Sequence, residues 1–129
     1  MSGTKQDYIN YRLLKSKELF EDVKLLAANK RWNSSINRLY YSSFYLVSAL
    51  LYKNDIKSET HNGTKTLFNL HFIKTGLIEI RFGKLYSNLF IWRQESDYLD
   101  FVEFDKETVE PIIEQVEELN SLLINILQS

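Results

Sequence analysis

Helix-breaking residues are almost absent from this chain, and their scarcity limits its possible folds more than any other feature. Its 129 residues include one proline and four glycines. These two residue types are the strongest interrupters of regular structure, so we expect long helices and short connections. Apolar residues recur at three- and four-residue steps, which is the spacing of one helical face. No run of strand length alternates with a period of two residues.

The apolar spacing predicts five helices, near residues 7–28, 31–52, 64–74, 80–95 and 106–127. Gly76 is expected to end the third helix, and Asp105 to cap the fifth. Residues 97–103 are expected to form an irregular connection. We therefore predict an all-α fold, an antiparallel up-and-down bundle of four to five helices. It should be a single domain over residues 1–129, with its core at about 7–127.

The second predicted helix, residues 31–52, is apolar on nearly every side. Tyr41, Phe44 and Tyr45 extend a broad apolar face almost all round it. A helix of this kind normally lies at the centre of a bundle or in an interface. We expect it to be central, and we expect a two-fold homodimer that buries residues of the second or fourth helix.

Composition restricts the setting in which this chain works. There is no cysteine, which excludes a disulfide framework and any zinc site built on cysteine. No apolar run approaches the length of a membrane span, and the first six residues are polar rather than signal-like. We expect a soluble protein of the cytoplasm that does not associate with membranes.

Charge is divided unevenly along the chain. Residues 1–65 carry 11 Lys and Arg against 6 Asp and Glu, whereas residues 66–129 carry 5 against 11. The basic half could face a polyanion such as RNA. Alternatively, the two halves could complement each other across the bundle or across a dimer.

Residues with recognisable chemistry are few. There is no glycine-rich phosphate loop and no nucleophile motif, and no histidine pair has metal-ligand spacing, so we expect no cofactor and no metal. His71 falls on an apolar helical face and is expected to be a hydrogen-bonded core residue. His61, beside Gly63, is either the first residue of a helix that orders the loop or a residue of a functional site.

Arg93 is the most informative polar residue. It follows Leu89 by four residues on an apolar stripe, so its guanidinium should be buried and paired. Asp97 stands four residues further on and can accept from it. Arg38, beside Asn37 on the second helix, is another candidate for a buried cation. Physical chemistry alone favours a clamp between helices over a functional site.

Three stretches of the sequence resemble one known family. In order along the chain they are NRLYYSSFYLVSALL, THNGTKTLFNLHFIKTGLI and RQESDYLDFVEFD. Together they resemble the HEPN superfamily, the higher eukaryotes and prokaryotes nucleotide-binding domain. The nearest match is its small stand-alone prokaryotic branch, and the resemblance covers about residues 7–125.

The resemblance implies a helical bundle that is usually dimeric. Many HEPN relatives are metal-independent endoribonucleases that act as toxins or in phage defence, and others pair with a minimal nucleotidyltransferase. In the nucleases a histidine follows the arginine after four to six residues. Counted from Arg93, that histidine would fall at Tyr98, Leu99 or Asp100, and none of them is histidine.

Three functional hypotheses remain open. The first is a HEPN-like protein of a toxin–antitoxin or defence module, which binds RNA or a nucleotide around Arg93, Asp97 and Tyr98. The second is a non-catalytic helical partner of a minimal nucleotidyltransferase. The third is a ribonuclease in which His61 supplies the imidazole. The candidate catalytic residues are Arg93, His61 and Tyr98, and the candidate binding residues are Arg93, Asp97, Asn37, Arg38 and Tyr41.

Overall fold

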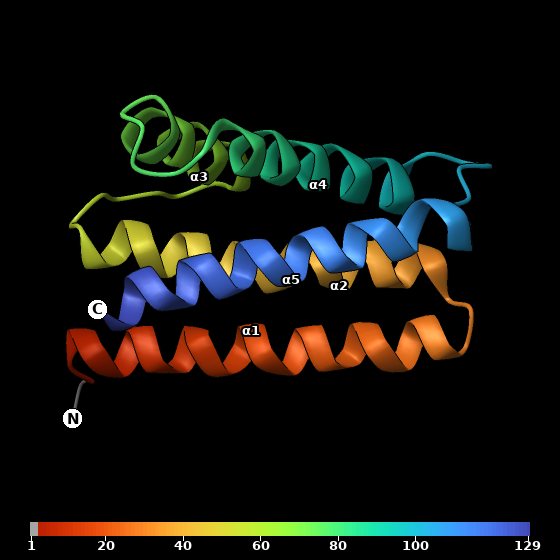
Figure 1. Cartoon of the computed structure of the whole chain (residues 1–129), viewed down its shortest axis with the longest axis horizontal. Coiled ribbons are helices and arrows are strands. Elements are labelled where there is room, and N and C mark those ends of the chain that lie inside the picture. Colours follow the sequence, from red (N-terminus) through yellow and green to blue (C-terminus); the bar gives the residue numbers. More distant parts are fainter. Residues whose placement is uncertain (1–2) are drawn as a thin grey trace.

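Residues 3–129, which a computed structural model describes, fold into five α-helices and one π-helical turn (Figure 1). There is no β-strand in this range, so the predicted all-α class is confirmed. Nor does any helix in it have the length and apolarity needed to cross a bilayer. In chain order the elements are α1 (Lys5–Ala28), α2 (Trp32–Lys53), α3 (His61–Phe68), η1 (Asn69–Ile73), α4 (Ile80–Tyr98) and α5 (Lys106–Gln128).

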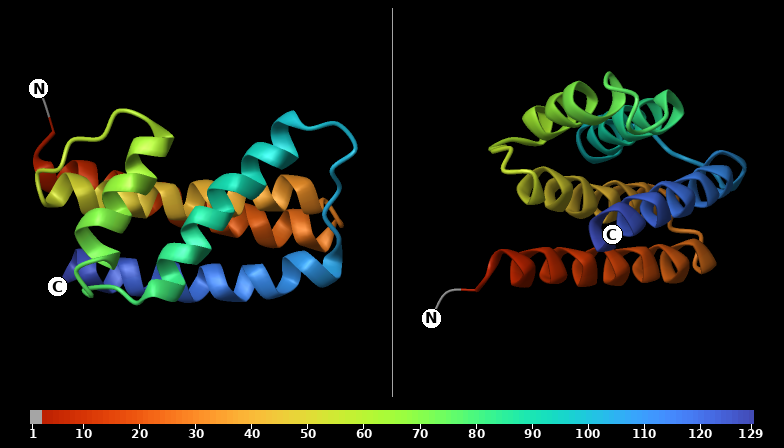
Figure 2. Two further views of the ribbon diagram at one scale, coloured as in Figure 1. Left: turned by 90° about the horizontal axis from the view of Figure 1, so that it is seen from above. Right: turned by 60° about the vertical axis from the view of Figure 1, so that its left-hand side comes forward.

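The expected central position of the second helix is confirmed. α2 lies beside α5, with α1 on one side and with α3 and α4 crossing on the other (Figures 1 and 2). It contacts each of these four helices. Its side chains supply much of the core, including the fully buried Ile36, Leu39, Tyr40, Leu46 and Val47.

Local capping decides where two helices begin. α1 starts earlier than the predicted residue 7 because Thr4 and Asp7 form a reciprocal capping box. α3 starts at His61 rather than at residue 64 because the Thr60 hydroxyl accepts from the amide of Gly63 at 2.8 Å. His61 is thereby fixed as the first residue of a helix.

Two predicted boundary signals are confirmed. The Asp105 carboxylate accepts from the amide of Thr108 at 2.9 Å and caps α5. Gly76 adopts a φ of +80° just after η1, a conformation that favours glycine.

The chain changes helix type between α3 and α4, which makes one prediction wrong. η1 is a π-helical turn, in which each residue rotates the chain by less than in an α-helix. Phe72 remains buried in this turn, whereas His71 is exposed. His71 is therefore not a core residue, because the π-turn shifts it off the apolar face that α-helical spacing assigned to it.

The prediction of an irregular connection from residue 97 is wrong at its start, because α4 continues to Tyr98. The amide of Leu99 still donates to the carbonyl of Glu95 at 3.1 Å. Asp97 therefore lies on the helix, one turn after Arg93.

A buried polar network joins α1, α2 and α5. The Asn120 side chain donates to Oγ of Ser42 at 3.0 Å and accepts from Oγ of Ser43 at 2.8 Å. Oγ of Ser16 donates to the carbonyl of Ser42 at 2.7 Å. All four residues are buried. Buried polar groups are stable only when hydrogen-bonded, so this network fixes how the three helices align.

We expect Asn120→Ala to lower the free energy of unfolding by about 1–3 kcal/mol, because it leaves the buried serine hydroxyls without their amide partner. Asn125→Ala, on the exposed side of the same helix, is the matched control and should change it by less than about 0.5 kcal/mol. Urea unfolding of both variants checks this. If the two variants lowered the free energy of unfolding equally, the buried network would not stabilise the fold.

Candidate functional site

Arg93 is buried, as its position after Leu89 predicted, with 6% of its surface exposed. Its guanidinium lies over the ring of Tyr40, 4.9 Å from the ring centre, and 5.6 Å from the ring centre of Tyr41. Nη1 lies 3.6 Å from Oδ2 of Asp97. Within residues 3–129, Nε has no hydrogen-bond partner. The charge is thus partly compensated, and one buried donor is left unsatisfied.

Asp97 connects Arg93 to the second helix. Its Oδ2 accepts from Nδ2 of Asn37 at 3.2 Å, and Oδ1 of Asn37 accepts in turn from Arg38. A shallow hollow of about 290 Å³ opens over this pairing, lined by Asn37, Arg38, Asp97 and their neighbours. The fold therefore brings together, between α2 and α4, four residues that the sequence had indicated as candidates: Arg93, Arg38, Asn37 and Asp97.

His61 approaches the same cluster from α3. Its Nδ1 lies 3.0 Å from the hydroxyl of Tyr40, and its ring centre is 4.5 Å from that of Phe44. Burial and, to a lesser extent, the positive charge of Arg93 lower the pKa of His61 below its ordinary value. The imidazole is therefore neutral near pH 7.

Tyr40 separates His61 from Arg93 and was missed as a site residue. Its spacing identifies it only as one of the buried residues of the second helix, yet it bonds His61 with its hydroxyl and faces Arg93 with its ring. Burial raises the pKa of Tyr40 to about 12, so the hydroxyl stays protonated. The pairing Tyr40–Tyr41 beside Asn37 and Arg38 was the only signal in the sequence that could have indicated it.

Tyr98 occupies a different environment from the other candidates. It is the last residue of α4, it is 74% exposed, and no side-chain hydrogen bond involves it within the described residues. The fold therefore assembles Arg93, Asp97, Asn37 and Tyr41 with His61, and leaves Tyr98 outside this group. We call the assembled residues, with Tyr40 and Arg38, the Arg93 cluster.

The Arg93 cluster combines a cation, a neutral imidazole and amide and hydroxyl groups. Such a set can hold an anionic oxygen and accept a proton. Among residues 3–129 no group of three or more His, Cys, Asp or Glu side chains could hold a metal ion.

Comparison with known proteins gives one family. The model of the HEPN domain matches residues 9–127. A UPF0332 protein of Thermotoga maritima is 39% identical over 113 residues, which cover 88% of this chain and 86% of that protein. Two proteins of Methanocaldococcus jannaschii that bear the name "putative toxin" are each 29% identical. The first match covers 77% of this chain and 67% of the relative, and the second covers 64% and 62%.

We expect Arg93→Ala to destabilise the protein by about 2–4 kcal/mol, because it empties the space over Tyr40 and removes the ion partner of Asp97. Arg81→Ala is the matched control on the same helix, since Arg81 pairs with Glu118 at the surface and should matter much less. Urea unfolding of both variants checks this. Equal decreases in the free energy of unfolding of the two variants would mean that the buried Arg93 stabilises the fold no more than the surface Arg81 does.

Proposed function

This chain belongs to the HEPN domain family, and on that premise we propose that it is a toxin-like member that binds RNA or a nucleotide at the Arg93 cluster. One observation carries the proposal. A buried guanidinium with an unpartnered Nε lies against the rings of Tyr40 and Tyr41, and its ion partner Asp97 lines the hollow beside it together with Asn37 and Arg38. An unsatisfied buried donor is unfavourable, and an anionic oxygen of a phosphate would relieve it.

The toxin-like role takes its support from the relatives. Two of them bear toxin names, and a third matches this chain over most of its length. We place this protein in a toxin–antitoxin or defence module of the cytoplasm, where a partner would hold it inactive.

For catalysis we propose that His61 replaces the histidine absent from positions 98–100. A neutral imidazole can take the proton from a 2′-hydroxyl while that oxygen bonds to phosphorus. The bond from phosphorus to the 5′-oxygen then breaks, and the protonated imidazole or water supplies a proton to the leaving oxygen. Tyr40 remains a protonated phenol and keeps the imidazole in place.

A docking role is the second candidate, because apolar residues are exposed at the end of α4. Tyr98 and Leu99 are exposed, and Phe101 is fully exposed at a φ of 65°. Exposed apolar groups this close together favour an interface. The partner would be an antitoxin or a minimal nucleotidyltransferase.

We further propose a homodimer. Trp32 on α2 and Trp92 on α4 are half-buried and leave apolar surface open to a second copy. Light scattering at tens of micromolar protein should give twice the mass of one chain. A monomer mass would exclude this assembly.

We expect cleavage of generic RNA to be weak or absent, and any activity to be independent of divalent metal. Where activity is found, His61→Gln should abolish it while keeping an amide that can donate to the oxygen of the Tyr40 hydroxyl, as Nδ1–H of His61 does when Nε2 is the base. The exposed His71→Gln is the matched control and should be neutral, and Tyr98→Phe should have the smaller effect. A single-turnover assay on labelled RNA compares these variants.

The pH profile provides a second readout. Because the pKa of His61 is lowered, the base form persists to more acidic pH than for a free imidazole. The rate should therefore persist to lower pH than it would with a base of ordinary imidazole pKa, and fall as His61 becomes protonated. Robust cleavage by a protein that lacks both histidines would exclude this mechanism.

A further inference from the structure

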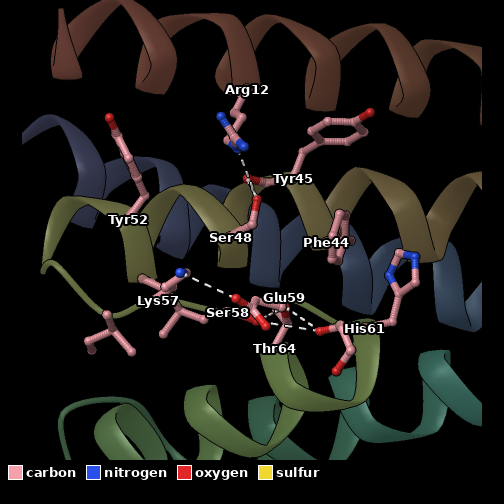
Figure 3. A pocket seen from close by; sticks show the side chains of 13 residues that line it. Arg12, Phe44, Tyr45, Ser48, Tyr52, Lys57, Ser58, Glu59, His61 and Thr64 are labelled. Carbon is pink, nitrogen blue, oxygen red and sulfur yellow. Dashed lines mark hydrogen bonds and ion pairs between the residues drawn. The ribbon is translucent and has the colours of Figure 1, made fainter.

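A second hollow lies beside the Arg93 cluster, and the proposal above gives it no role. It lies between α2 and the segment that leads into α3, with α1 alongside, and has a volume of about 300 Å³ (Figure 3). That volume is at the lower end of ligand pockets, about 300–1,000 Å³. His61 lines it, so this pocket, which we call the α2–α3 pocket, shares a residue with the Arg93 cluster.

Aromatic rings from α2 line one side of the pocket. Phe44 and Tyr45 are half-buried there, and Tyr52 lies further along the same helix (Figure 3). The ring of Phe44 also packs against His61, 4.5 Å between centres. Half-buried aromatic rings accept any planar base by stacking, without requiring a particular hydrogen-bond pattern.

A guanidinium from α1 lies beside these rings, with Cζ of Arg12 5.9 Å from the ring centre of Tyr52. Nε of Arg12 donates to Oγ of Ser48 at 3.2 Å, which aims the side chain at the pocket (Figure 3). Within residues 3–129 no carboxylate pairs with Arg12. Glu59 is the one carboxylate that lines the pocket, and it pairs with Lys57 at 3.3 Å. The charge of Arg12 is therefore available to an anion.

We propose that the α2–α3 pocket binds one nucleotide unit, with its base against Phe44 and Tyr45 and its phosphate on Arg12. The unit is either a free nucleotide or an unpaired nucleotide of an RNA strand that also reaches Arg93. A base held in a duplex cannot enter the pocket. The strand form of this inference rests on the proposed function, whereas the free-nucleotide form does not.

Binding titrations with AMP, with a short single-stranded RNA and with the same RNA in a duplex test the proposal. Arg12→Gln should weaken binding of AMP and of the single-stranded RNA by about tenfold. For the RNA it should also reduce the slope of log affinity against log salt by about one. Lys74→Gln removes one charge from an exposed site outside the pocket and is the matched control, with no change expected. The duplex should bind more weakly than the single strand.

A second variant tests the pocket without changing a charged residue. Ser48→Phe fills the pocket with a ring and should weaken binding of AMP and single-stranded RNA, although the charge of Arg12 is kept and only its hydrogen bond to Ser48 is lost. Thermal unfolding confirms that each variant is folded before it is titrated. Loss of binding in both Arg12→Gln and Ser48→Phe, with Lys74→Gln unaffected, supports the pocket.

The outcomes separate this inference from the proposed function. If Arg93→Lys loses RNA while Arg12→Gln and Ser48→Phe bind like the unaltered protein, the pocket is overturned and the proposed function stands. If the two pocket variants lose AMP and Arg93→Lys binds RNA normally, the pocket stands and the proposed function fails. Failure of the unaltered protein to bind either AMP or the single-stranded RNA overturns the pocket.

Discussion

The structure depends on the burial of α2 by helices on three of its sides. α1 packs beside Ser42, α5 meets Ser43 through Asn120, and α4 contributes rings against Tyr40. Burial of apolar surface drives this arrangement, and the serine–asparagine hydrogen bonds select one alignment of the helices. The Arg93 cluster lies where α4 packs against α2, and the α2–α3 pocket lies between α2 and the segment that leads into α3. The position of each therefore follows from how the bundle encloses its central helix.

In the function that we propose, Arg93 serves both stability and recognition with the same atoms. A buried cation is tolerated only with compensating groups, and here the faces of Tyr40 and Tyr41 and the carboxylate of Asp97 supply them. The compensation is incomplete, because Nε has no partner within residues 3–129. Under the proposed function, this unpartnered Nε is the donor that an anionic oxygen of the ligand would satisfy.

The sequence predicts the elements better than it predicts the site. Regular apolar spacing and scarce helix breakers identify the helices, and the step from Leu89 to Arg93 predicts a buried cation. The meeting of His61 with Arg93 could not be predicted, because it depends on how α3 packs against α2 through Tyr40. The apolar spacing misplaced His71 because it assumes that each residue rotates the chain as in an α-helix. A π-helical turn rotates the chain by less per residue. Asp97 was assigned to a connection because no sequence signal revealed that Asn37 would hold it on α4.

The π-helical turn also affects how this sequence aligns with those of homologues. A π-turn holds one more residue than the α-helical turn it replaces, so deleting a single residue from Asn69–Ile73 would let the segment close as ordinary α-helix. Gly83 packs so closely on this turn that a Cβ there would lie 2.9 Å from Cγ1 of Ile73. A homologue without the extra residue would therefore show a one-residue gap at this point of an alignment, and would be free to carry a larger side chain in place of the glycine.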